Sequence, residues 1–289
     1  MQEIKFNGQA KTLPGSWKEV KPEHLPRLLQ LVYFTPDSPE KFHHMLQILL
    51  DMGGNQWRAL MRKHFGPGMS KKVKNANAIV LHELIHQVRW MSQELTTELP
   101  FEAIQYKNWS LLLPEQDFLT MSFGELSDAY IHFLVWIKQI VPGDAHLDLL
   151  VATLCRPERS GAYSLEPGWN GDKREPYNEF TAKEMAKKLA GMELSQKQMV
   201  LLYFTGNMQK VLARYELFDG EAGEPEEYPG QGWIKNQHIL AEKGIFGTMQ
   251  QAKEANLHDV LLFLEENKKD IKRSADAAAN ERQKQEANQ

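Results

Sequence analysis

The sequence of 289 residues lacks several features that would point to a particular chemistry. It has one cysteine, Cys155, so the chain cannot form an internal disulfide, and cysteine-based zinc and iron–sulfur sites are excluded. No stretch reaches the roughly 18 apolar residues of a membrane-spanning helix, and the start has no basic segment followed by an apolar run. We therefore expect a soluble protein in a reducing, intracellular compartment, with Cys155 as a small buried hydrophobic residue.

Excess positive charge and phosphate-binding loops are missing as well. Lys and Arg number 34 and Asp and Glu number 38, which leaves a net charge of −4. A weakly acidic surface does not attract nucleic acid or anionic lipid through its overall field. Neither G-x-x-x-x-G-K-[ST] nor G-x-G-x-x-G occurs, so nucleotide hydrolysis is not expected. We expect neither nucleic acid nor a membrane as a partner.

The composition is that of a globular protein, and apolar residues mostly recur at helical spacing. Hydrophobic residues make up 42% of the chain and charged residues 25%, close to the average for folded domains. The pattern predicts a mainly α-helical, bundle-like protein. The expected helices cover about 22–33, 39–50, 57–65, 75–95, 122–137, 144–154, 181–190, 195–218, 232–243 and 256–271. Ser122 followed by Glu125 matches a capping box at the start of one of them.

Two short segments predict β-hairpins instead. Ile4 and Phe6 alternate with polar residues and precede Asn7-Gly8, a dipeptide that suits a tight turn. A second hairpin is expected within 102–113, with its turn at Lys107-Asn108.

The distribution of these elements suggests four regions. The expected N-terminal hairpin and helical domain spans 1–155, and a long loop rich in Gly, Pro and polar residues spans 156–180. A C-terminal helical region follows at 181–271. Residues 272–289 contain Ala, charged residues and amides with almost no large apolar residue, which predicts a frayed helix or a disordered tail.

One motif in the sequence has a known chemistry. His82-Glu83-Leu84-Ile85-His86 matches H-E-x-x-H, in which two histidines four residues apart on a helix bind zinc and the glutamate acts as base on the metal-bound water. The third ligand of such a site would be Glu125, with Asp128 on the same helix face to orient a histidine. The alternative is an ordinary amphipathic helix that turns two histidines to water.

Two charged stretches are candidates for contacts with partners. Basic residues gather between Arg58 and Lys74, and acidic residues between Asp219 and Glu227. Each is also compatible with a solvated surface. A contact between the two stretches in neighbouring copies is one route to a homo-oligomer.

The order of segments resembles a poorly characterised family of proteins from tailed phages and prophages. The resemblance covers about two thirds of the chain, and its motifs are diffuse. It is carried by Phe6-Asn7-Gly8 with Leu13-Pro14 and Trp17, Leu113-Pro114, Met121 to Glu125, Leu149 to Ala152, Cys155 to Pro157, Gly171 to Asn178, Val200 to Phe204, and Gly232-Trp233 leading to Leu240-Ala241.

This resemblance implies a role in virion assembly. The expected protein is a non-enzymatic, tail-assembly-chaperone-like protein that binds a phage structural or tail component. It would act in the cytoplasm of the bacterial host or stay associated with the virion. No cofactor is expected from this resemblance. The alternative is a zinc-dependent metallohydrolase or peptidase that uses His82, Glu83, His86 and Glu125.

Overall fold

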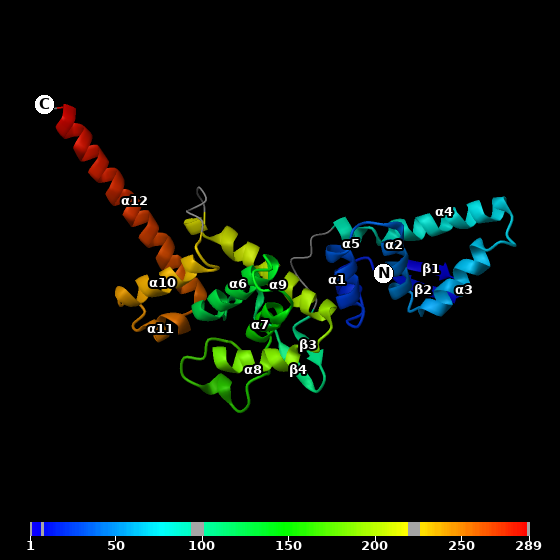
Figure 1. Ribbon diagram of the computed structural model, residues 1–289, viewed down its shortest axis with the longest axis horizontal. Helices are drawn as coiled ribbons and strands as arrows, with labels where there is room; N and C mark the ends of the chain where they lie inside the picture. Colours follow the sequence, from blue (N-terminus) through cyan, green and yellow to red (C-terminus); the bar gives the residue numbers. More distant parts are fainter. Residues whose placement is uncertain (1, 7–8, 94–100, 219–225, 288–289) are drawn as a thin grey trace. The chain divides into compact units, whose positions relative to one another are not determined.

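The computed structural model describes residues 2–6, 9–93, 101–218 and 226–287, and the protein is mainly α-helical, as expected. The chain divides into two compact units (Figure 1). Unit 1 comprises 1–101 and 193–203, and unit 2 comprises 102–192 and 204–289. The helix α9 (Leu194–Arg214) therefore contributes to both. This division differs from the boundaries expected at 155 and 181.

Unit 1 begins with the expected hairpin and continues with helices. Strands β1 (Gln2–Phe6) and β2 (Gln9–Leu13) pair antiparallel, with Gln2 opposite Leu13; the expected turn at Asn7-Gly8 lies outside the described residues. The 3₁₀ turn η1 and five α-helices follow: η1 (Trp17–Glu19), α1 (Leu25–Phe34), α2 (Pro39–Leu49), α3 (Gly54–Phe65), α4 (Lys71–Val88) and α5 (Trp90–Gln93).

Local sequence explains where these helices begin. Ser38 accepts a hydrogen bond from the backbone N–H of Lys41, and Pro39 occupies the first position of α2. Ser70 caps α4 in the same way, so that helix begins before the expected residue 75. The single helix expected over 75–95 is wrong, because it ends at Val88 and α5 follows a break at Arg89. Gly53 and Gly54 stand at the start of α3.

Unit 2 contains the second hairpin and the remaining helices. Strands β3 (Ala103–Tyr106) and β4 (Trp109–Leu112) pair antiparallel, and Lys107 in the turn has a φ of 52°. The 3₁₀ turns are η2 (Gln116–Phe118), η3 (Tyr163–Leu165) and η4 (Glu216–Phe218). The α-helices that belong wholly to this unit are α6 (Phe123–Ile137), α7 (Ala145–Leu154), α8 (Glu179–Leu189), α10 (Gln231–Glu242), α11 (Met249–Glu254) and α12 (Leu257–Ala287).

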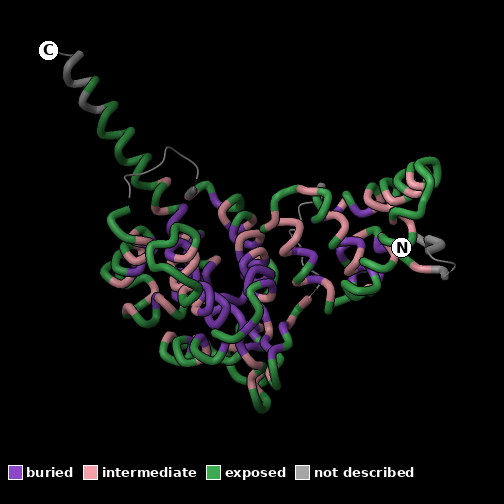
Figure 2. The backbone as a smooth tube through the Cα atoms, turned by 45° about the vertical axis from the view of Figure 1, so that its right-hand side comes forward, coloured by how far each residue is buried: buried purple, intermediate pink, exposed green. Residues whose placement is uncertain are grey.

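The core of unit 2 lies where α7 packs against α6 and α8, with Phe204 of α9 beside Phe118 and Phe133, and Figure 2 shows the buried segments of the chain. Phe118, Phe123 and Phe204 are fully buried there, and Cys155 is buried as expected. The expected 272–289 tail belongs largely to α12, whose residues 271–280 are exposed. None of the described helices is long and apolar enough to cross a membrane.

The capping box expected at the start of α6 is incomplete, and α7 begins without a side-chain cap. Ser122 does cap α6 by accepting from the backbone N–H of Glu125, but the Glu125 side chain does not return to complete a capping box and enters the core. Asp144 precedes α7 without capping it, and its carboxylate accepts a hydrogen bond from Trp136 instead. In both cases a tertiary partner outcompetes the local backbone group.

Candidate functional site

The H-E-x-x-H residues lie on the exposed side of α4. His82, Glu83 and His86 are all exposed, and Val88 at the end of the helix is buried. The spacing therefore places both imidazoles on a solvent-facing surface, as the amphipathic alternative describes. Among the residues that the structure describes, no group of three or more His, Cys, Asp or Glu side chains lies close enough together to hold a metal ion.

Glu125, the candidate third ligand, is committed to two arginines in the core of unit 2. Its Oε1 accepts from Nη1 of Arg174 at 2.7 Å and from Nη1 of Arg156 at 2.8 Å. Its Oε2 accepts from the Nη2 atoms of the same two arginines at 3.3 Å. Both carboxylate oxygens are thus engaged by arginines. The zinc hypothesis, with His82, His86 and Glu125 as ligands and Glu83 as base, stays a prediction.

Asp172 completes this buried ion network as its second carboxylate. Its Oδ1 accepts from Nε of Arg174 at 2.9 Å. Its Oδ2 accepts from Nη2 of Arg174 at 2.8 Å and from Nη2 of Arg156 at 3.3 Å. The remaining guanidinium hydrogens donate to backbone carbonyls, including that of Leu154. Burial disfavours the charged guanidinium, but Glu125 and Asp172 outweigh it and raise the pKa of Arg174.

The network joins distant parts of the chain and is internally neutral. Two carboxylates face two guanidinium groups, and all four side chains are nearly buried. Such a network holds the long loop, which carries Asp172 and Arg174, against α6. It leaves no unpaired group for catalysis, so we assign it a structural role. Arg156, Asp172 and Arg174 were not expected in the core, because the charged Gly171–Asn178 segment resembles a surface loop.

A second polar cluster lies beside the network. The hydroxyl of Tyr177 donates to Oδ2 of Asp128 at 2.6 Å, so Asp128 orients a tyrosine and not a histidine. Burial raises the pKa values of both groups, and for Asp128 the hydrogen bond from Tyr177 acts in the opposite direction. Both residues line a polar cavity of about 230 Å³ together with Lys253. This hydrogen bond ties the long loop to α6.

Two histidines meet between α6 and α7. The Nδ1 atoms of His132 and His146 lie 3.2 Å apart. Burial lowers the pKa of His132 to about 4, and the neighbouring His146 and Lys183 act in the same direction. At neutral pH both rings are therefore uncharged. The Nδ1–H of one ring then donates a hydrogen bond to Nδ1 of the other, with the tautomers setting which ring is the donor.

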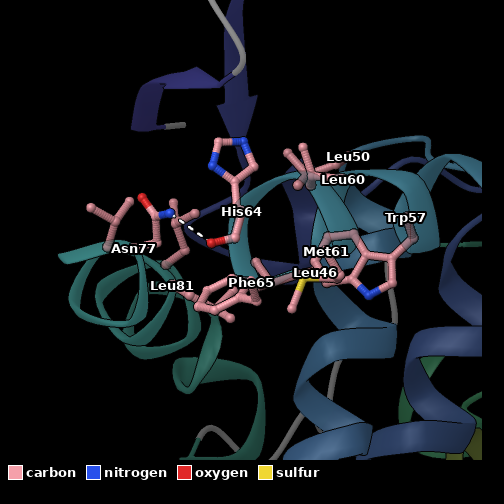
Figure 3. Close-up of a pocket in the computed structure, with 11 residues that line it drawn as sticks. Leu46, Leu50, Trp57, Leu60, Met61, His64, Phe65, Asn77 and Leu81 are labelled. Carbon is pink, nitrogen blue, oxygen red and sulfur yellow. Dashed lines mark hydrogen bonds between the residues drawn. The ribbon is translucent and has the colours of Figure 1, made fainter. Parts of the chain in front are cut away.

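An apolar groove in unit 1 lies among α2, α3 and α4 (Figure 3). Its volume is about 240 Å³. Leu46 and Leu50 at its base are buried, whereas Val80 on α4 is 56% exposed. Its lining, called the apolar groove below, comprises Leu46, Leu50, Trp57, Leu60, Met61, His64, Phe65, Asn77, Val80, Leu81 and Leu84.

A polar contact joins two walls of the apolar groove, α3 and α4. The Asn77 side chain on α4 donates to the backbone carbonyl of His64 on α3 at 2.9 Å (Figure 3). This hydrogen bond joins the two helices and fixes the spacing of the walls. Apart from Asn77 and His64, the lining residues have apolar side chains, so the groove is suited to binding an apolar surface.

Comparison with known proteins does not add to this description. No family model, curated protein or solved structure matches the chain. The geometry of its own residues is therefore the basis for assigning a function.

Proposed function

We propose that this chain is a non-enzymatic phage morphogenesis protein, tail-assembly-chaperone-like, which binds a virion or tail component through the apolar groove. The observation that carries the proposal is the open apolar lining of α3 and α4. Leu60, Met61, Phe65 and Leu81 are only partly buried, and Val80 is exposed. Apolar surface of this kind is characteristic of a binding site.

The chemistry of the lining also supports a binding role. Methionine and leucine side chains adapt to different apolar partners, and the partly buried aromatic ring of Phe65 adds apolar contact area. An assembly chaperone needs such a surface, because it must cover an apolar segment of its client until that segment enters the particle. The resemblance to phage and prophage proteins points to a tail component as the client.

Co-expression tests this proposal. The chain would be produced with the tail tube and tape-measure proteins encoded in the same genome, and the soluble fraction of each candidate client would be measured. We expect one of them to stay soluble with the wild-type chain and to precipitate with Val80→Asp. A charge placed in the groove loses the transfer free energy of the apolar contact and adds a desolvation cost.

Ile79→Asp is the matched control. Ile79 is 63% exposed, precedes Val80 on the same helix and does not line the groove. The same substitution there preserves client solubility if the groove is the binding site. Equal protection of the clients by wild type and Val80→Asp would refute the proposal, provided that circular dichroism shows both variants folded.

A further inference from the structure

The helices that form two walls of the apolar groove carry an unusual charge. Between residues 54 and 88 the only acidic residue is Glu83, whereas Lys and Arg occur six times in this segment: Arg58, Arg62, Lys63, Lys71, Lys72 and Lys74. The chain as a whole has a net charge of −4. Positive charge is therefore concentrated on the helices that border the groove.

The helical positions of three of these basic residues, Arg58, Arg62 and Lys74, place them beside the groove lining. On α3, Arg58 and Arg62 each follow a lining residue, Trp57 and Met61, by about 100° around the helix. Both arginines are exposed. On α4, Lys74 precedes Asn77 by three residues and so lies on the neighbouring strip of the helix surface. The groove therefore has an apolar centre and a cationic border formed by Arg58, Arg62 and Lys74.

The apolar face of α4 has the spacing used in helix packing. Val73, Asn77, Val80 and Leu84 follow one another at intervals of four, three and four residues. Val73 is 43% exposed and extends the stripe one turn beyond the groove lining. This spacing is that of a helix seam into which side chains of a second helix insert. From Val73 to Leu84 the stripe is about 16 Å long, which matches about three turns of a partner helix.

We infer that the apolar groove binds an acidic amphipathic α-helix of a partner protein, with its apolar face on the Val73–Leu84 stripe and its carboxylates toward Arg58, Arg62 and Lys74. This inference rests on the proposed function and specifies the chemistry of the client. Carboxylates beside the apolar seam complement the cationic border, whereas a basic helix would meet like charge.

Two designed peptides test the inference in the full-length chain. One is an amphipathic helix with Leu at the seam positions and Glu at the flanking positions, and its twin has Lys in place of every Glu. Fluorescence anisotropy measures the dissociation constant of each. Exposed ion pairs contribute about 1.4- to fivefold each in affinity. Three of them in the middle of this range predict that the acidic peptide binds about tenfold more tightly at low salt, a preference that high salt reduces.

Variants locate the binding site and its charge preference. Val80→Asp is expected to weaken binding of the acidic peptide at least about tenfold, since it places a charge in the seam, and Ile79→Asp is expected to leave binding unchanged. The double variant Arg62→Glu, Lys74→Glu reverses two border charges and should favour the Lys peptide. These substitutions are at surface positions, and circular dichroism and the unfolding midpoint verify the fold.

Three outcomes overturn the inference. The first is equal binding of both peptides, or tighter binding of the Lys twin. The second is a complex with duplex DNA that needs Arg62 but is unaffected by Val80→Asp, which would assign the positive charge to nucleic acid. The third is a dimer in sedimentation that Val80→Asp dissociates, which would make a second copy the occupant. A tail protein that is kept soluble through Val80 while the peptides show no charge preference refutes only the acidic helix, and the proposed function survives.

Discussion

Glu125 and Arg174 are 49 residues apart in the sequence, and their side chains meet in the core of unit 2 with 2.7 Å between Oε1 and Nη1. Both side chains are at most 2% exposed. This contact joins the first turn of α6 to the long loop before α8. It makes the loop part of the folded core and explains why a charge-rich segment can be well ordered there.

The first prediction concerns the loss of one charge from this network. Glu125→Gln leaves Arg156 and Arg174 with Asp172 as their only carboxylate partner. An uncompensated buried charge costs about 3–5 kcal/mol, so we expect the free energy of unfolding to fall by that amount in urea titrations. Glu184→Gln is the control, because Glu184 pairs with Lys187 on an exposed helix face. A similar, small change in both variants would contradict the structural role of the network.

The network also illustrates what the sequence can and cannot predict. Ser122 and Glu125 gave the start of α6 correctly, since a cap depends on residues within one turn. The contacts of the Glu125 side chain cannot be predicted from the local sequence, because its partners Arg156 and Arg174 lie 31 and 49 residues away along the chain. Arg174 has no local sign of burial, and only its tertiary partners make burial of the charge favourable.

The same distinction applies to the helices and the apolar groove. Apolar spacing predicted α3 and most of α4, and the alternating pattern predicted both hairpins. It did not predict the break at Arg89 or the short helix α11, which depend on packing. The apolar residues of the groove were expected on buried faces. Whether another part of the chain covers such a face depends on tertiary arrangement, so the opening at Val80 was not predictable.

The second prediction concerns acid sensitivity. The pKa of His132 is about 4 in the folded protein, below the ordinary value of about 6.5 that applies in the unfolded chain. Between these two pH values the unfolded state therefore binds more protons than the folded state. The contribution of His132 to the free energy of unfolding is fully present above about pH 6.5 and is lost as the pH falls toward about 4. One such group changes the free energy of unfolding by up to about 1.4 kcal/mol per pH unit.

Urea titrations across this pH range measure the slope for the wild type and for His132→Asn. The variant should lose the His132 contribution, so its stability changes less between neutral and acidic pH. Titrating groups that do not interact with His132 cancel in the comparison, including the opposite contribution of Asp128. Identical slopes in the wild type and in His132→Asn would show that His132 is not held neutral by the fold.

The third prediction compares two glycines with a positive φ. Gly230 before α10 has a φ of 78°, and a Cβ placed there would lie 2.4 Å from Cγ1 of Ile131. Gly143 has a φ of 93° with open space around it. Alanine at either position costs about 1–2 kcal/mol for the left-handed backbone, and Gly230→Ala adds a steric cost of about 1–3 kcal/mol. Thermal unfolding should therefore show a larger loss of stability for Gly230→Ala, and equal losses would contradict the close contact between α6 and α10.

The last prediction separates the binding protein from the zinc hydrolase. His82, Glu83 and His86 are exposed on α4 and outside the lining of the apolar groove. Substitutions at exposed positions usually change stability by less than about 0.5 kcal/mol. We therefore expect His86→Ala and Glu83→Ala to leave both the unfolding midpoint and client binding unchanged. Two imidazoles without a third protein ligand hold zinc weakly, so dialysis against zinc-free buffer should remove zinc added to the protein. One zinc per chain that survives dialysis in the wild type and is lost in His86→Ala, together with a hydrolytic activity lost in Glu83→Ala, would establish the hydrolase instead.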